Sequence, residues 1–194
     1  MTDERGFKLL QVEILGQQVS LETRRGLFSP EHVDRGTLAM LSTVEFRPGM
    51  KVMDLGCGCG VVGITAARKC GAENVVMSDV NESAVETARA NAALNGVDGV
   101  EVVLSDGFAA VNRTGFDLIL SNPPYQSDFS VAKRFIEKGF NRLKLGGRMV
   151  MVTKRLDWYR NKMRAVFGGV RVQEIDGYYV FEAERREIRY AKKK

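Results

Sequence analysis

The chain has 194 residues, of which 44% are hydrophobic and 27% are charged, as in a soluble globular protein with room for one core. It contains no charge-poor apolar run long enough to span a bilayer, and residues 1–8 lack an apolar export signal. These features exclude a membrane-spanning or exported protein. We predict a single domain over 1–194 in the cytoplasm, with an N-terminal hairpin and loop at 1–30 and a basic tail at 185–194.

The charge is unevenly distributed. The net charge of +5 and the isoelectric point near 9.2 favour a polyanionic partner. The basic excess lies late in the chain, where residues 154–164 interleave cations with Trp158 and Tyr159. Two interpretations of this segment stay open, an RNA contact and a solvated helix face. The last three lysines are interpreted as a solvated tail.

The three cysteines, Cys57, Cys59 and Cys70, have neither the spacing of a zinc site nor that of a disulfide framework. We interpret them as small residues that pack near a turn. The one histidine, His32, is interpreted as a surface or capping residue, and no second histidine is present to form a metal cluster with it. We therefore predict no metal.

The predicted elements alternate along most of the chain. Apolar residues alternate with polar ones on both sides of Gly16-Gln17, which predicts a β-hairpin, and a helix is predicted over 31–41, starting at Pro30. Strands and helices then follow one another: strands over 52–55, 74–78, 100–104, 116–121 and 148–153, and helices over 61–69, 82–94, 131–143 and 157–167. Gly146-Gly147 is predicted to end the third of these helices. Two last strands, 170–175 and 178–183, flank a turn at Asp176-Gly177. This order predicts an α/β fold with a doubly wound, mostly parallel seven-stranded sheet and a reversed terminal strand.

The segment from Met50 to Gly63 reads as a buried strand, a turn containing Gly56, Gly58 and Gly60, and the start of a helix. Such a turn brings backbone N–H groups and a helix N-terminus to the sheet edge where open α/β sheets bind nucleotide-like ligands. Two interpretations fit it. Residues 58–63 match the dinucleotide pattern G-x-G-x-x-G, with Asp79 about twenty residues on. Alternatively, residues 54–60 form the unit, and the acid before the first glycine suits a ligand that carries a cation.

Three acids, Asp54, Asp79 and Asp106, follow successive predicted strands. The carboxyl ends of parallel strands meet at one edge of a sheet, so all three are expected to face one crevice. There Asp79 can accept from ribose hydroxyls, Asp106 from the amino group of an adenine, and Asp54 can meet a cationic amino acid portion.

A fourth strand end carries Asn122-Pro123-Pro124-Tyr125. The prolines fix an extended backbone and supply no N–H, so the Pro123 carbonyl and the Asn122 side-chain oxygen become two rigid acceptors. Aimed at an exocyclic amino group, they would hold both hydrogens and stabilise positive charge that develops on the nitrogen. Tyr125 offers a face for stacking of a planar base or amide.

The motifs DLGCGCG, SD and SNPPY, with the acid that ends the second strand, resemble class I S-adenosylmethionine-dependent methyltransferases that act on amino nitrogen. The segments GLFSPEHVDRGT and GYYVF are similar to the small methyltransferase (MTS) family, which includes guanine-N2 enzymes of small-subunit ribosomal RNA. The resemblance implies a Rossmann-like fold. It also implies S-adenosylmethionine held by Asp54, Gly56, Gly58, Gly60, Asp79, Asp106 and Asn122, and a target amine held by residues 122–125. It further suggests that Phe28, Ser29 and Thr37 close over the cofactor.

Two departures from the guanine-N2 pattern keep the acceptor open. Those enzymes carry an additional N-terminal domain, which we do not find in this sequence, and they have Phe-His where this chain has Tyr125-Gln126. The Asn-Pro-Pro-Tyr motif also resembles that of adenine-N6 and protein glutamine-N5 methyltransferases. We predict methyl transfer to guanine N2 of ribosomal RNA, with these two acceptors as alternatives. A NAD-type oxidoreductase and a non-catalytic RNA-binding module are less consistent with the motifs, and the sequence leaves open whether a homodimer forms.

Overall fold

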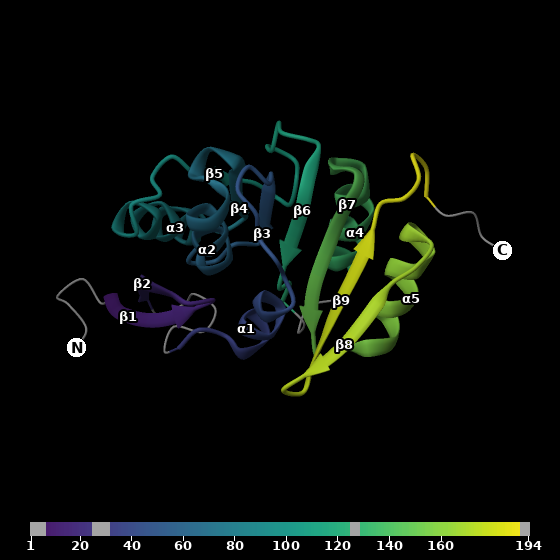
Figure 1. The fold of residues 1–194 in the computed structure, drawn as a ribbon, viewed down its shortest axis with the longest axis horizontal. Coiled ribbons are helices and arrows are strands. Elements are labelled where there is room, and N and C mark those ends of the chain that lie inside the picture. The colour runs from purple at the N-terminus through teal and green to yellow at the C-terminus, as the bar shows by residue number, and fades with distance from the viewer. Residues whose placement is uncertain (1–6, 25–31, 125–128, 191–194) are drawn as a thin grey trace.

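The structure is a computed structural model that describes residues 7–24, 32–124 and 129–190 (Figure 1). Its centre is a seven-stranded sheet with the strand order β5-β4-β3-β6-β7-β9-β8. The strands are β3 Val52–Leu55, β4 Val75–Asp79, β5 Glu101–Leu104, β6 Phe116–Ser121, β7 Leu143–Thr153, β8 Arg171–Ile175 and β9 Tyr178–Glu184. The helices are α1 Arg35–Ser42, α2 Val61–Cys70, α3 Glu82–Leu94, α4 Ser130–Arg142 and α5 Leu156–Phe167, with a short 3₁₀ turn η1 over Ala72–Asn74.

Strands β3, β4, β5, β6 and β7 run parallel to one another, and β9 runs antiparallel to both β7 and β8. The reversed strand is therefore the last one in the chain, which confirms the predicted fold class. Asp176 and Gly177, both at positive φ, form the tight turn between β8 and β9, as the sequence predicts.

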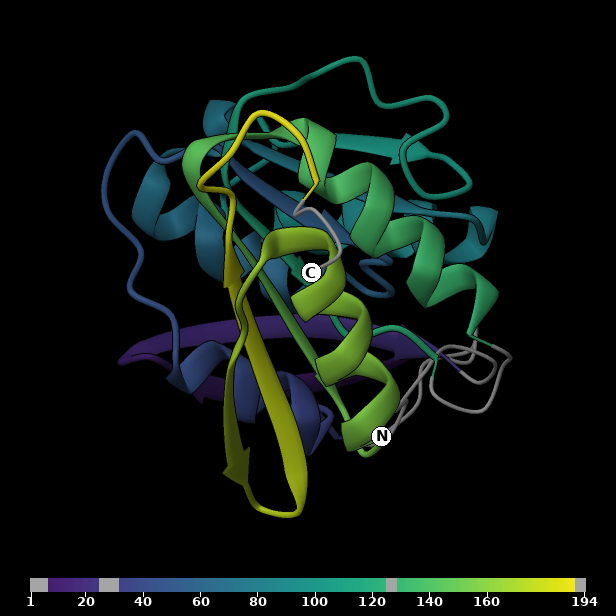
Figure 2. The same cartoon turned by 90° about the vertical axis from the view of Figure 1, so that its right-hand side faces the viewer.

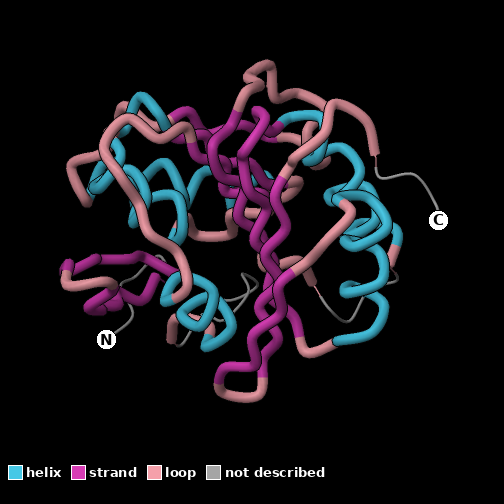
Figure 3. Tube along the Cα trace, turned by 45° about the vertical axis from the view of Figure 1, so that its right-hand side comes forward, coloured by secondary structure: helices cyan, strands magenta, loops and turns pink. Residues whose placement is uncertain are grey.

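Helices cover both faces of the sheet (Figure 3), because side chains of each strand alternate between the two faces. On β4, Val75 and Met77 pack in one apolar cluster with α1, α2 and α3, while Val76 packs in the other with α4 and α5. Figure 2 shows α4 and α5 together on one side of the sheet and α1 on the other. In the part of the chain that the structure describes, no helix is long and apolar enough to cross a membrane.

The N-terminal hairpin, β1 Phe7–Ile14 and β2 Gln17–Arg24, forms a separate two-stranded sheet below α2 and α3 in Figure 1. Its turn is Leu15-Gly16, one residue earlier than predicted. Asn91 of α3 and Asn95, the C-cap residue of that helix, attach it. Asn95 bonds the N–H and the C=O of Ser20, at 3.1 and 2.6 Å, and Asn91 bonds those of Glu22, at 2.7 and 2.9 Å. The helix therefore pairs with alternate residues of β2 through side-chain amides.

The largest differences from the predicted bounds lie at the starts of α1 and β7. Helix α1 begins at Arg35 rather than at 31, because Asp34 is extended and its carboxylate caps the helix by accepting from the Thr37 N–H at 2.9 Å. Gly146-Gly147 does not end α4. That helix ends at Arg142, and the two glycines lie within β7. A Cβ at Gly147 would stand 2.6 Å from the carbonyl oxygen of Phe116, so the glycine permits a close approach to β6.

Candidate active site

A cavity of about 560 Å³ opens at the carboxyl edge of the parallel strands, which is where open α/β sheets place ligands. Its volume is typical of small-molecule sites. Four strand ends contribute to the wall, through Asp54 within β3 and Gly56 after it, Asp79 at the end of β4, Asp106 after β5, and Asn122 and Pro124 after β6. The hairpin adds Leu10, Leu21 and Thr23. The structure thus brings the three predicted acids, Gly56 and Gly58 of the glycine turn, and Asn122 and Pro124 to one cavity, whereas the predicted Gly60 and Pro123 do not line it.

The glycine turn folds tightly against the end of β4. Gly56, Gly58 and Gly60 all have positive φ, and the N–H groups of Gly56 and Cys57 both donate to the carbonyl of Ser78, at 2.8 and 2.9 Å. The next glycine of the run, Gly63, has a different role, since a Cβ there would stand 2.3 Å from Met77. Gly63 therefore lets α2 pack closely on the sheet.

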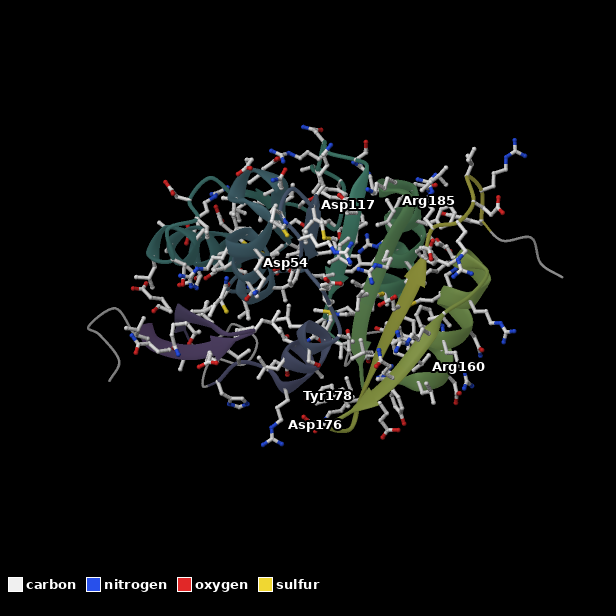
Figure 4. All side chains as sticks on the ribbon, viewed as in Figure 1. Asp54, Asp117, Arg160, Asp176, Tyr178 and Arg185 are labelled. Atoms are coloured by element: carbon white, nitrogen blue, oxygen red, sulfur yellow. The ribbon has the colours of Figure 1, made fainter. Side chains whose placement is uncertain are left out.

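Asp54 is buried, with 2% of its surface exposed, and it lies inside the molecule in Figure 4. Its Oδ2 accepts a hydrogen bond of 2.8 Å from the Gly63 N–H. Burial raises the pKa of this carboxyl from 3.8 to about 7, and the nearby charge of Asp79 adds to the rise, against the Gly63 hydrogen bond. A buried carboxylate with this environment is stabilised by a ligand that brings a positive charge.

Asp79 and Asp106 have different environments. Asp79 is oriented by backbone donors, because its Oδ2 accepts from Gly58 and its Oδ1 from Asn81, each at 2.9 Å. Asp106 forms a two-pronged ion pair with Arg134 of α4, with distances of 2.7 and 3.0 Å, and about half of its side chain is exposed. The sequence analysis did not predict Arg134, since the ion pair joins residues 28 positions apart.

Asn122 follows β6, and its amide nitrogen contacts the start of α1. Nδ2 donates to Oδ1 of Asp34 at 2.8 Å and is 3.0 Å from Oγ1 of Thr37. Both partners belong to the start of α1, and both line the cavity with Asn122. The amide oxygen Oδ1 is then the branch left to act as an acceptor in the cavity.

Pro123 is buried and Pro124 is exposed at the cavity wall. Three residues named from the sequence, Tyr125, Phe28 and Ser29, lie outside the described residues, so their expected roles stay predictions.

Cys57, Cys59 and His32 line the cavity, whereas Cys70 is the last residue of α2. Burial raises the pKa of the Cys57 thiol well above its usual range and those of Cys59 and Cys70 to about 11, so all three are protonated at neutral pH. His32 is exposed at the cavity wall. Among the described residues, no group of three or more histidines, cysteines or acids is placed to hold a metal ion.

Three residues that hold the site together, Asp34, Arg134 and Asn91, were not predicted from the sequence. Asp34 has a local signal, since Asp is a preferred N-cap residue of helices, but a cap alone does not indicate a contact with Asn122. Asn91 donates to the carbonyl of Cys59 in the glycine turn at 2.9 Å, as well as to the hairpin. Nothing in the spacing of these residues indicates the long-range partners.

Fold and site together define a doubly wound α/β domain. A cavity of nucleotide-binding type lies at the carboxyl edge of its parallel strands, and an Asn-Pro-Pro segment forms part of the cavity wall. The chain belongs to the methyltransferase small domain family, whose model matches residues 18–182. This confirms the family resemblance found in the sequence.

Similar proteins include the ribosomal RNA small subunit methyltransferases C of Pseudomonas putida and Hahella chejuensis. The first is 34% identical over 82% of this chain and 49% of its own length, and the second 32% over 96% and 53%. Among solved structures, the T. Thermophilus 16S rRNA N2 G1207 methyltransferase (RsmC), in complex with AdoMet and guanosine, matches with a TM-score of 0.83 and 25% identity. The match covers 93% of this chain and 51% of that chain. The chain spans about half the length of the curated relatives it matches.

Proposed function

We propose that this chain is an S-adenosylmethionine-dependent methyltransferase that acts on an exocyclic amino nitrogen of an RNA base. One observation carries the proposal. A single cavity is lined both by Asn122 and by three acids at strand ends, and those acids suit a nucleoside with a cationic side chain. The amide nitrogen of Asn122 is bonded to Asp34 and Thr37, so its oxygen remains as an acceptor.

The residues at the strand ends fit S-adenosylmethionine. Asp54 is a buried carboxylate beside a helix N-terminus and suits the charged amino acid portion, and Asp79 is oriented to accept from the ribose hydroxyls. Asp106 already accepts from Arg134, but a carboxylate offers about four lone-pair sites, so it can also accept from an adenine amino group. The cofactor supplies an electrophilic methyl group on its sulfonium sulfur.

The Asn-Pro-Pro segment would supply orientation and electrostatics. Asn122 Oδ1 and the carbonyl of Pro123 would accept the two hydrogens of the target amine, so that its lone pair faces the methyl group. As the nitrogen gains positive charge in the transition state, both acceptors stabilise it. This mechanism needs no metal and no covalent intermediate, because positioning lowers the barrier.

Guanine N2 of ribosomal RNA is the proposed acceptor. The two curated relatives are named as ribosomal RNA small subunit methyltransferases, and the T. Thermophilus enzyme is described with guanosine. Adenine N6 and protein glutamine N5 stay as the alternatives to be tested. An enzyme that acts on ribosomal RNA works where ribosomes are assembled, so the proposal keeps the cytoplasm as its location.

A surface beside the Asn-Pro-Pro segment supports RNA as the partner. Phe129 and Trp158 stack with their ring centroids 4.3 Å apart, and the Arg155 guanidinium lies 5.0 Å from the Phe129 ring centre. Lys154 and Arg155, between β7 and α5, are exposed. Cations next to aromatic rings suit the phosphates and bases of a single-stranded nucleic acid. Arg160, farther along α5, pairs with Asp157 and contributes less charge to a partner.

The test is the transfer of a labelled methyl group from S-adenosylmethionine, with total RNA, ribosomal subunits and a protein extract offered in parallel. Mass spectrometry of the nucleosides identifies the acceptor, and Asn122→Ala is the inactive control. N2-methylguanosine that disappears in the variant is the expected result. N6-methyladenosine would change the base, label in protein alone would favour glutamine, and no transfer to any acceptor would overturn the proposal.

A further inference from the structure

Asp34 occupies a junction between helix α1 and the Asn-Pro-Pro segment. One oxygen of its carboxylate, Oδ1, accepts from the Thr37 N–H at 2.9 Å and from Asn122 Nδ2 at 2.8 Å. Thr37 Oγ1 lies 3.0 Å from the same amide nitrogen. Both hydrogens of the Asn122 amide therefore have partners on the first turn of α1.

These contacts fix which way the amide faces. An ionised carboxylate accepts hydrogen bonds and donates none, so the Asn122 nitrogen, and not its oxygen, must face Asp34. The amide group is planar, and its oxygen is consequently turned away from α1. The backbone before Asn122 is held as well, because the fully buried Ser121 donates from Oγ to the Leu55 carbonyl at 2.7 Å.

The position of the carboxylate is itself constrained. A Cβ at Gly36 would stand 2.9 Å from Asp34 Oδ1 and 2.8 Å from the Tyr178 ring, so only a glycine lets these groups pack together. Tyr178, labelled at the lower end of β9 in Figure 4, is itself buried. The sheet thus supports the start of α1 beside Asn122.

The charge of Asp34 also affects the amide electronically. A hydrogen bond from the amide N–H to a carboxylate is charge-assisted, and it polarises the group so that more electron density lies on the amide oxygen. That oxygen is the atom expected to accept from the target amine, where positive charge develops during methyl transfer.

We propose that Asp34 is a positioning residue for methyl transfer, which orients the Asn122 amide and strengthens its oxygen as an acceptor for the target amine. This inference rests on the proposed function of the site. It assigns a second role to a residue whose local role is that of a helix cap.

The informative variant is Asp34→Asn. An asparagine caps a helix as well as an aspartate does, and its side-chain oxygen can still accept from both Thr37 and Asn122, so only the charge is lost. We expect kcat to fall about tenfold, as a weakened charge-assisted bond predicts, with the melting temperature and the Kd for S-adenosylmethionine unchanged. Asp34→Ala, which also removes the orientation, should lower kcat about 100-fold or more.

The matched control is Asp98→Asn, between α3 and β5. It removes the same charge from an exposed side chain that does not line the cavity, and kcat should not change. A second readout is independent of activity. The side-chain amide signals of Asn122 in a ¹⁵N–¹H NMR spectrum, assigned by their absence from Asn122→Ala, should show slow hydrogen exchange in the wild type, and they should shift in Asp34→Asn.

Three results would overturn the inference: a wild-type kcat in Asp34→Asn, an equal loss of kcat in Asp98→Asn, or Asn122 amide signals whose chemical shifts Asp34→Asn does not change. A loss of kcat that comes with an equal loss of cofactor affinity would assign Asp34 a structural role instead. If the wild type transfers methyl groups to no acceptor, the proposed function fails and the catalytic role of Asp34 fails with it. In that case the NMR experiment still decides whether Asp34 orients Asn122.

Discussion

Asn91 is the side chain that joins the N-terminal hairpin to the glycine turn, and its removal should weaken both the fold and cofactor binding. It is fully buried in α3. Its Oδ1 accepts from the Glu22 N–H at 2.7 Å, and its Nδ2 donates to the carbonyls of Glu22 and Cys59, each at 2.9 Å. Asn91→Ala would leave three backbone groups without their partner.

The size of the effect follows from these three bonds. Each contributes about 1 kcal/mol net, which gives about 3 kcal/mol in total, and alanine returns about 0.7 kcal/mol through its higher helix propensity. A net loss of about 2 kcal/mol lowers the melting temperature of a chain of this size by about 4–8 °C. Because Cys59 and the hairpin residue Leu21 both line the cavity, we also expect the Kd for S-adenosylmethionine to rise several-fold.

Thermal and urea denaturation measure the first effect, and calorimetric titration with S-adenosylmethionine measures the second. Asn141→Ala is the control, because Asn141 is an exposed residue of α4 that also bonds a carbonyl, that of Glu137 at 3.3 Å. A melting temperature for Asn91→Ala equal to that of the control would refute the assigned bonds. A lower melting temperature with unchanged cofactor affinity would refute the coupling between hairpin and cavity.

Three further predictions concern the cavity and the surface beside it. The pKa of Asp54 is raised from 3.8 to about 7, so this group makes the free protein lose stability as pH rises from about 4 to about 7. A cationic cofactor favours the charged form of Asp54. The rise in melting temperature caused by S-adenosylmethionine should therefore grow between pH 5.5 and 8 in the wild type but not in Asp54→Asn. Gly63→Ala would place a Cβ 2.3 Å from Met77 and should lower the free energy of unfolding, measured in urea titrations, by about 1–3 kcal/mol. Gly169→Ala is the control and should cause no comparable loss, because no atom lies within 4 Å of a Cβ at that position. Arg155→Ala should weaken RNA binding and reduce the dependence of RNA affinity on salt concentration. Trp158→Ala should weaken RNA binding with the salt dependence unchanged. An identical salt dependence for the wild type and Arg155→Ala would rule out phosphate contact by Arg155.

Local sequence patterns determined much of this protein. A short continuous apolar run distinguishes strands such as β4 from longer, alanine-rich helices such as α3. The order of strands and helices then requires a parallel sheet with a common carboxyl edge. Asp54, Asp79 and Asn122 were expected at that edge because each ends a strand. The structure places all three at one cavity, and the family match agrees with the motifs that they belong to.

Only the tertiary structure decided how these residues are held. Asn122 meets Asp34 across 88 positions of sequence, and Asn91 meets Glu22 across 69. No local sequence pattern predicts such pairs, because they depend on how α1, α3 and the hairpin pack against the sheet. The sequence therefore determined which groups reach the cavity, whereas packing between distant elements decided which way the Asn122 amide faces and what fixes the glycine turn.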